Sequence, residues 1–183
     1  MLANRTPRAE TPGMAVRPLA SVPRDGAAPA DALLHPATLV ALGLLILNDH
    51  VLKAAYPGAV TGKLSDLAGL AFFPILLVGG WEIVLAMTSH WRGPSNRALA
   101  IAIGGTAAGF TLVKVWPVAA QAFAWGLGLA QWVLALPVSL LGGGPLPPVV
   151  PTVVVVDPTD LVALLALATP AWIGIARVRA ERP

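Results

Sequence analysis

Long apolar runs separated by short polar segments dominate this chain. Four of the runs, at residues 33–52, 67–87, 98–113 and 161–176, carry polar groups mainly at their ends. A helix needs about 20 apolar residues to cross a bilayer, and local bilayer thinning or snorkelling flanks accommodate shorter runs such as the last two. The pattern predicts an all-α membrane protein with four transmembrane helices, the third rich enough in glycine and alanine for close helix packing.

A further apolar stretch, Val118–Leu141, complicates this count. It contains two glutamines, two tryptophans and the closely spaced glycines Gly126 and Gly128. Three interpretations fit these residues: a fifth span, a re-entrant hairpin that turns near the glycines, or a helix lying in the membrane interface, where tryptophan is enriched.

Positive charges decide among these interpretations. All nine arginines lie in the first 31 residues, between the second and third runs, or at the C-terminus, whereas the three lysines lie on the other connections. Basic residues are enriched on the cytoplasmic side, and only four crossings place every arginine there. We therefore predict two helical hairpins with both termini cytoplasmic, and a re-entrant or interfacial helix within an insertion at residues 118–150.

The overall composition agrees with a membrane location. Apolar residues make up 56% of the 183 residues and charged residues 11%, with a mean hydropathy of +0.75, whereas ordinary soluble domains carry about 25% charged residues. The absence of cysteine excludes disulfides and thiolate metal sites, and we expect no other metal site and no cofactor. A net charge of +3 does not indicate a nucleic-acid partner.

The chain divides into three parts. Residues 1–31 are polar and contain five prolines, and such a composition does not bury enough apolar surface to fold. We expect a disordered cytoplasmic tail here, with a cleaved secretory signal as the rival interpretation. Residues 32–177 are the predicted transmembrane domain, and residues 178–183 are a short cytoplasmic tail.

The two halves of the predicted domain resemble each other weakly. When Lys53 is aligned with Lys114, each is followed by an aromatic residue and a proline, and similar sequences around Asp66 and Asp160 open the second and fourth runs. A repeat with its axis along the membrane normal would bring these two aspartates face to face. Because facing carboxylates repel, we expect either a raised pKa of one aspartate or a cation between them, and Lys53 or Lys114 could supply that positive charge. The same repeat places Lys63 opposite Asp157. Chance similarity between apolar helices is the alternative.

Charged side chains gather at the predicted outer ends of the spans. Asp157 and Pro158 have the pattern of a helix N-cap and first residue, Ser65 is another N-cap candidate, and Asp49 and Lys53 are spaced to pair on one helix face. Capping and pairing do not explain why so many aspartates and lysines share one membrane face. The candidate residues for binding an ion or ligand are Asp49, His50, Lys53, Lys63, Asp66, Lys114, Asp157 and Asp160.

Glu82 is the one acidic residue in a predicted span that lies away from the polar end of its run. It lies about 15 residues into the second run, or about 22 Å at helical rise, and therefore near the cytoplasmic boundary. An ionisable residue within a span is a functional candidate, but at this depth we expect the carboxylate to snorkel to the cytoplasmic interface.

Several segments resemble a family of small, uncharacterised bacterial multi-pass membrane proteins. The resemblance rests on Asn48-Asp49-His50-Val51-Leu52-Lys53, on Thr61-Gly62-Lys63-Leu64-Ser65-Asp66-Leu67-Ala68-Gly69-Leu70 and on Asp157-Pro158-Thr159-Asp160-Leu161. It implies an integral protein of a bacterial cytoplasmic membrane and supplies no activity. A fainter likeness to VanZ-like membrane proteins is too short to carry any residue across.

Three functional hypotheses follow from the outer-face residues, and no catalytic residue is assigned. The first is a non-enzymatic membrane protein that binds an ion, a lipid headgroup or a partner membrane protein. The second is a membrane-embedded enzyme acting on lipid-linked substrates, with an aspartate and His50 as acid–base pair. The third is a small transporter or proton-coupled module.

Overall fold

The structure is a computed structural model that describes residues 26–143 and 146–180, and within these ranges it contains helices and no strands. Five helices are long and apolar enough to cross a membrane, which confirms the all-helical membrane class. The elements are η1 (Asp31–Leu34), α1 (Pro36–Leu47), the π-helical η2 (Asn48–Leu52), α2 (Lys53–Ala55), α3 (Ala59–Met87), α4 (Asn96–Val115), α5 (Pro117–Leu141), the 3₁₀-helical η3 (Pro158–Leu167) and α6 (Ala168–Ala180).

The helices are longer than the apolar runs that predicted them. The third run, predicted at 16 residues, lies in a helix of 20 residues, and the fourth lies in the 23 residues of η3 and α6. Polar and charged residues extend both helices at their ends, where a count of apolar residues stops early. Local thinning of the bilayer is therefore not needed to accommodate them.

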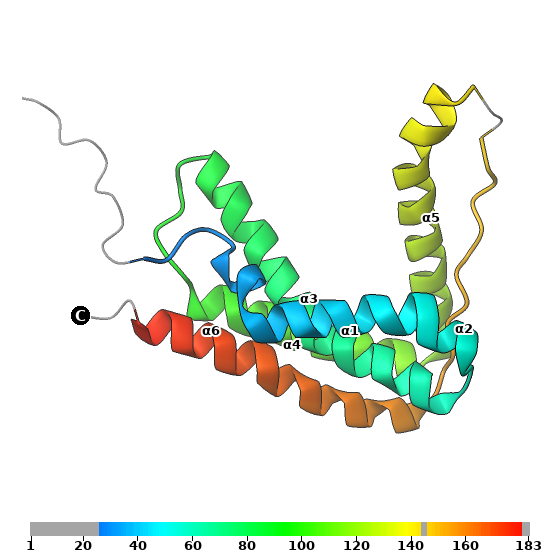
Figure 1. Ribbon diagram of the computed structural model, residues 1–183, viewed down its shortest axis with the longest axis horizontal. Coiled ribbons are helices and arrows are strands. Elements are labelled where there is room, and N and C mark those ends of the chain that lie inside the picture. Colours follow the sequence, from blue (N-terminus) through cyan, green and yellow to red (C-terminus); the bar gives the residue numbers. More distant parts are fainter. Residues whose placement is uncertain (1–25, 144–145, 181–183) are drawn as a thin grey trace, which may run out of the picture.

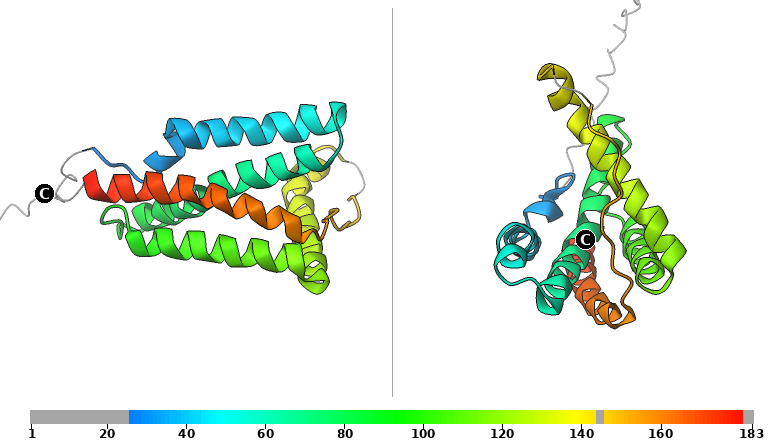
Figure 2. Two further views of the ribbon diagram at one scale, coloured as in Figure 1. Left: turned by 90° about the horizontal axis from the view of Figure 1, so that it is seen from below. Right: turned by 90° about the vertical axis from the view of Figure 1, so that its right-hand side faces the viewer.

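Four rods lie side by side in a bundle: α1 with η2 and α2, then α3, α4, and η3 with α6 (Figures 1 and 2). Successive rods run in opposite directions, so the bundle has two chemically different ends. We call them the arginine end and the lysine end. The arginine end carries Arg92, Arg97, Arg177 and Arg179, and the lysine end carries Lys53, Lys63 and Lys114.

The buried core is thin and the outer surface is apolar. Buried side chains such as Ile75, Leu70 and Ala163 join the rods, but large apolar side chains also point outward, including Val60 at 81% and Leu165 at 75% exposure. Soluble monomers rarely expose apolar surface on every long helix. The outer faces of the bundle therefore suit a lipid environment.

Glycines permit close helix approach, but not in the predicted third span. A Cβ added at Gly174 would lie 2.4 Å from a methyl carbon of Leu99, and one at Gly79 would lie 2.9 Å from Leu33. In contrast, Gly104 and Gly105 of α4 face open space. The glycines of the third run therefore do not serve helix packing among the described residues, whereas its alanines Ala102 and Ala107 pack against the neighbouring rods.

Prolines modify two of the rods. Pro74 lies in the middle of α3, near the place where the helix changes direction (Figure 1), as expected for a residue that removes one backbone hydrogen bond. The ten residues of η3 form an unusually long 3₁₀ helix. This segment ends three residues before Pro170, whose missing N–H leaves the carbonyl of Ala166 without its α-helical donor.

Helix α5 is continuous over 25 residues and lies across the lysine end of the bundle (Figures 1 and 2). The prediction of a re-entrant hairpin with a turn at Gly126 and Gly128 is therefore wrong. Both residues lie inside the unbroken helix Pro117–Leu141. Its direction is transverse to the four rods (Figure 1), whereas its length and composition would also allow it to cross a membrane.

An extended segment returns along α5 to the bundle. The indole N–H of Trp132 donates to the carbonyl of Pro147 at 2.7 Å, and the N–H of Thr152 donates to the carbonyl of Ala124 at 3.1 Å. A Cβ at Gly128 would lie only 2.1 Å from the carbonyl oxygen of Val150. Gly128 is thus required by the close approach of this segment rather than by a turn.

The predicted N-terminal tail lies outside the described residues up to position 25. From Ala28 onward the chain is part of the bundle, because the carbonyl of Ala28 accepts a hydrogen bond from Arg177 and Asp31 forms an ion pair with the same arginine. The predicted boundary at residue 31 is therefore too late. Of the predicted C-terminal tail, residues 178–180 continue α6 and the last three residues lie outside the described part.

A lysine–aspartate cluster as candidate functional site

Three rods meet at the lysine end and contribute charged side chains to one group. Helix α3 supplies Lys63 and Asp66, α4 supplies Lys114 from its last turn, and the start of η3 supplies Asp157 and Asp160. These five residues are the lysine–aspartate cluster. All five belong to the set predicted from the sequence.

Lys114 lies between the two aspartates that the repeat aligns. Its Nζ is 2.8 Å from Asp66 Oδ2 and 2.7 Å from Asp160 Oδ2. Because both carboxylates contact the same nitrogen, they lie well within a Debye length of about 8 Å. The lysine side chain is only 12% exposed, and its Nζ also lies 5.4 Å from the ring centroid of Phe110. The expected cation between the two aspartates is thus a residue of the chain itself.

Lys63 joins α3 to the start of η3. Its Nζ donates to Asp160 Oδ1 at 2.5 Å and to the Thr159 hydroxyl at 2.8 Å, and it lies 3.8 Å from Asp157. Both oxygens of Asp160 are therefore occupied by lysines. The pairing of Lys63 with Asp157 expected from the repeat is present but long, and Asp160 is the closer partner.

Asp157 is the N-cap of η3, as predicted. Its Oδ1 accepts from the Thr159 hydroxyl at 2.8 Å and from the Thr159 backbone N–H at 2.9 Å. These two hydrogen bonds to the ionised carboxylate hold the pKa of Asp157 below its usual value of 3.8. Asp157 is therefore ionised at neutral pH and contributes a full negative charge to the cluster.

The cluster carries more carboxylates than lysines. Three aspartates face two lysines, so the group has one negative charge in excess when all five are ionised. Among the described residues, Asp66 forms an ion pair with Lys114 alone, while Asp160 contacts both lysines. The excess charge therefore lies nearest to Asp66 and the exposed Asp157.

A second polar group at the same end ties α1 to α3. Asn48 is completely buried, and its amide donates to the Thr61 carbonyl at 2.7 Å and to the Ser65 hydroxyl at 2.6 Å. Ser65 in turn donates to Asp49 at 2.6 Å, and Asp49 pairs with Lys53 at 2.7 Å. Lys53 is therefore engaged within this group and does not take the place in the cluster that its alignment with Lys114 suggested.

Ser65 is not an N-cap, contrary to the prediction. Helix α3 begins at Ala59, so Ser65 lies more than one turn inside the helix, where its hydroxyl forms hydrogen bonds with residues of η2. The polar residues Thr61 and Lys63 do not interrupt the helix, because their side chains bond to the Tyr56 carbonyl and to Asp160.

Asn48 is buried in this polar group but was not among the functional residues predicted from the sequence. It opens the π-helical η2, in which the backbone N–H of Lys53 donates to the Asn48 carbonyl five residues back. An asparagine near the end of an apolar run was a usable signal, because a buried amide in a membrane must find partners. Its partners Thr61 and Ser65 lie on another helix and were not readable from sequence.

The remaining predicted residue, His50, forms no hydrogen bond with either polar group at the lysine end within the described part of the chain. It is exposed, and among the described residues no hydrogen bond joins it to an aspartate. The acid–base pair required by the enzyme hypothesis is thus not assembled. Within residues 26–143 and 146–180, no group of three or more histidine, cysteine, aspartate and glutamate side chains gathers as it would around a metal ion.

Glu82 does not snorkel, contrary to the prediction. It is buried at the arginine end with 3% exposure, where it accepts a hydrogen bond from Arg177 at 2.7 Å and another from the Ala30 backbone N–H at 2.8 Å. Arg177 also pairs with Asp31. A partner on α6 makes burial of this carboxylate more favourable than extension to the interface. We call Glu82, Arg177 and Asp31 the arginine lock.

Comparison of the chain with protein-family models, curated proteins and solved structures finds no match. The resemblance to an uncharacterised bacterial membrane family stays a prediction.

Proposed function

We propose that this chain is a four-span protein of a bacterial cytoplasmic membrane. In this proposal α1, α3, α4 and η3 with α6 cross the bilayer, and α5 lies in the outer interface. The side-by-side packing of the four rods, the transverse direction of α5 and the separation of arginines from lysines support it. With the positive-inside rule, the arginine end and both termini are cytoplasmic.

Reporter fusions and cysteine labelling test this topology. A reporter at Pro183 that is active only in the cytoplasm should give a signal, and one that is active only outside should not. Because the chain has no cysteine, single cysteines at Val118 and Leu141 should both react with an impermeant reagent added from outside. Labelling of these two positions from opposite sides would instead make α5 a fifth span.

We infer further that the lysine–aspartate cluster binds a small monovalent cation. The observation that carries this is the sharing of Lys114 by Asp66 and Asp160, at 2.8 Å and 2.7 Å, within a group of three aspartates and two lysines. Carboxylates held this close favour uptake of positive charge. Asp66, whose single ion-pair partner among the described residues is Lys114, supplies an oxygen for it. This proposal departs from the sequence prediction of no metal site, and it concerns an ion held beside Lys114 by few carboxylate oxygens, since no group of three or more acidic or histidine side chains gathers within the described residues.

The same geometry disfavours the other hypotheses. Both lysines already contact carboxylates, so an anionic headgroup would have to displace an aspartate from each. The enzyme hypothesis lacks a histidine near the cluster. A transport route would have to pass the apolar contacts of Leu70, Ala163 and Leu167, which lie between the cluster and the arginine end.

Thermal unfolding of the purified, detergent-solubilised protein tests cation binding. At constant ionic strength, lithium, sodium or potassium chloride should raise Tm relative to N-methylglucamine chloride, and Asp66→Asn should abolish this increase. Asp49→Asn, which removes a charge at the same end but outside the cluster, is the matched control and should respond like the wild type. An equal Tm of the wild type in all four salts would show that the cluster only joins the rods.

A further inference from the structure

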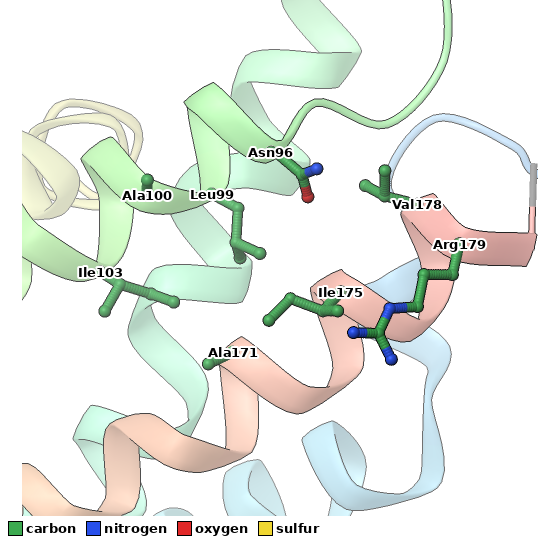
Figure 3. A pocket seen from close by; sticks show the side chains of 8 residues that line it. All are labelled: Asn96, Leu99, Ala100, Ile103, Ala171, Ile175, Val178 and Arg179. Carbon is green, nitrogen blue, oxygen red and sulfur yellow. The ribbon is translucent and has the colours of Figure 1, made fainter. Parts of the chain in front are cut away.

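A groove opens between α4 and α6 at the arginine end, opposite to the lysine–aspartate cluster. Its volume is about 460 Å³, within the range of about 300–1,000 Å³ typical of sites for small molecules. Apolar side chains such as Leu99, Ile103 and Ile175 form its walls, and Asn96 and Arg179 lie toward the helix ends (Figure 3). The groove is thus apolar along its length and polar at its mouth.

Arg179 is available to a ligand. Its side chain is exposed, and within the described parts of the chain no ion pair engages it. The neighbouring Arg177, by contrast, is held by Glu82 and Asp31. The two arginines on the last turns of α6 therefore have different tasks, one inside the lock and one at the groove.

The first turn of α4 adds donors at the same mouth. Ser95 caps this helix by accepting from the Ala98 N–H at 3.3 Å, which leaves the N–H groups of Asn96 and Arg97 directed out of the helix start. The N-terminus of a helix favours anions, and phosphate in particular. An exposed guanidinium on α6 and the start of α4 thus border the same apolar groove (Figure 3).

A second groove on the other side of α4 repeats this combination. It has a volume of about 650 Å³ and is lined by apolar residues including Leu77 and Ile101, with Arg97 and Ser95 at the helix start. Trp81 also lines it, and tryptophan is enriched at the membrane interface. The region around the start of α4 is therefore basic and apolar on both sides.

We propose that the groove between α4 and α6 binds an anionic phospholipid. The phosphate contacts Arg179 and the first N–H groups of α4, Arg97 adds a second positive charge nearby, and an acyl chain lies along Leu99, Ile103 and Ile175. Basic pockets between transmembrane helices on the cytoplasmic side commonly bind anionic headgroups. The proposal requires only a membrane protein and is independent of cation binding at the opposite end.

Native mass spectrometry of the detergent-solubilised full chain, titrated with phosphatidylglycerol or phosphatidylcholine, tests the site. The wild type should retain phosphatidylglycerol in preference to phosphatidylcholine. Arg179→Gln should bind phosphatidylglycerol about tenfold more weakly, as expected for loss of one charge-assisted contact. Arg92→Gln is the matched control and should leave binding unchanged, because Arg92 donates to the carbonyls of Ser89 and Trp91 and lines neither groove.

A second pair of variants tests the acyl chain separately from the charge. Ala100→Trp fills the groove with an exposed residue of α4 and should lower the affinity for phosphatidylglycerol, whereas Ala108→Trp, exposed on the same helix outside both grooves, should not. Equal retention of both lipids by the wild type, or equal binding by Arg179→Gln and Arg92→Gln, would overturn the proposal and leave ordinary annular lipid in the groove.

Discussion

The two ends of the bundle each hold a network of buried or half-buried charges, but the networks are built differently. In the arginine lock, Glu82 is 3% exposed, and one of its oxygens accepts from Arg177 and the other from the Ala30 N–H. In the lysine–aspartate cluster, side-chain exposure ranges from 11% for Asp160 to 39% for Asp157, and the cations are lysines.

In the proposed function, this difference separates a structural tie from a site that binds a cation. The planar guanidinium of Arg177 donates in fixed directions to Glu82 and to the Ala28 carbonyl, and it forms an ion pair with Asp31. A lysine ammonium is a compact charge on a flexible stem, so Lys63 and Lys114 can shift between carboxylates at low cost. The arginine lock should therefore fail when any member is removed, whereas the cluster should adapt.

The largest effect is expected from Arg177→Ala. This variant leaves Glu82 buried without its charged partner, which typically costs about 3–5 kcal/mol. Unfolding of the protein in mixed detergent micelles, followed by tryptophan fluorescence, measures the loss. The triple variant Asp31→Asn, Glu82→Leu and Arg177→Met should recover much of the stability, because no uncompensated charge of the arginine lock is left. A loss under about 1 kcal/mol for Arg177→Ala, as for an exposed pair, would contradict a locking role.

The contrast between the two ends also shows which contacts can be predicted from the sequence. Contacts of the cluster lie at the ends of helices that the apolar pattern predicts, so aligning Lys53 with Lys114 and Asp66 with Asp160 was enough to place two carboxylates together. The same alignment treated the two lysines as equivalent. Only the structure shows that Lys114 enters the cluster, because Asp49, one turn away on the same helix face, already engages Lys53.

The arginine lock could not be predicted, because its members are not linked by a repeat or a local spacing in the sequence. Glu82 and Arg177 are 95 residues apart. Their pairing depends on the packing of α3 against α6, where Ile75 and Ile173 share one buried cluster, and on Ala28–Asp31 folding back onto the bundle, and neither leaves a periodic signal. The direction of α5 could not be predicted either. Its residues permit a span, a hairpin or an interfacial helix, and only the structure shows one continuous helix that contacts residues 146–152.

A smaller effect is expected from Lys114→Met in the cluster. Asp66 then loses its lysine, but Lys63 still holds Asp160 and the partly exposed carboxylates can be hydrated, so we expect a loss of about 2 kcal/mol at neutral pH. Because protonation removes the repulsion between Asp66 and Asp160, the deficit relative to the wild type should shrink on acidification. Micelle unfolding at pH 7 and at lower pH measures this. A deficit as large as that of Arg177→Ala would erase the distinction between the two networks.

The contact between α5 and the returning segment, residues 146–152, can be weakened without changing a charged residue. Gly128→Ala places a methyl group where the Val150 carbonyl lies 2.1 Å away, so the returning segment must shift, at a cost of about 1–2 kcal/mol. Gly126→Ala, with open space around its Cβ, is the matched control. Limited proteolysis between residues 142 and 157 should be faster for Gly128→Ala only. Equal cleavage of both variants would show that the segment does not depend on this contact.

The smallest effect is expected for Asp157, the most exposed member of the cluster. Its pKa lies below 3.8 because Thr159 donates two hydrogen bonds to the carboxylate. For a lowered pKa, the stabilising contribution is present above the ordinary value and is lost as pH falls through the folded-state value. Asp157→Asn keeps a capping oxygen but does not titrate. Between about pH 5 and pH 3, where aspartates protonate, the wild type should lose slightly more stability than Asp157→Asn. Thermal unfolding of both proteins over this range isolates the residue, because every other carboxylate titrates in both. Parallel pH profiles would mean that the exposed carboxylate contributes as a cap alone and not as a charge, and the excess negative charge of the cluster would then rest on Asp66.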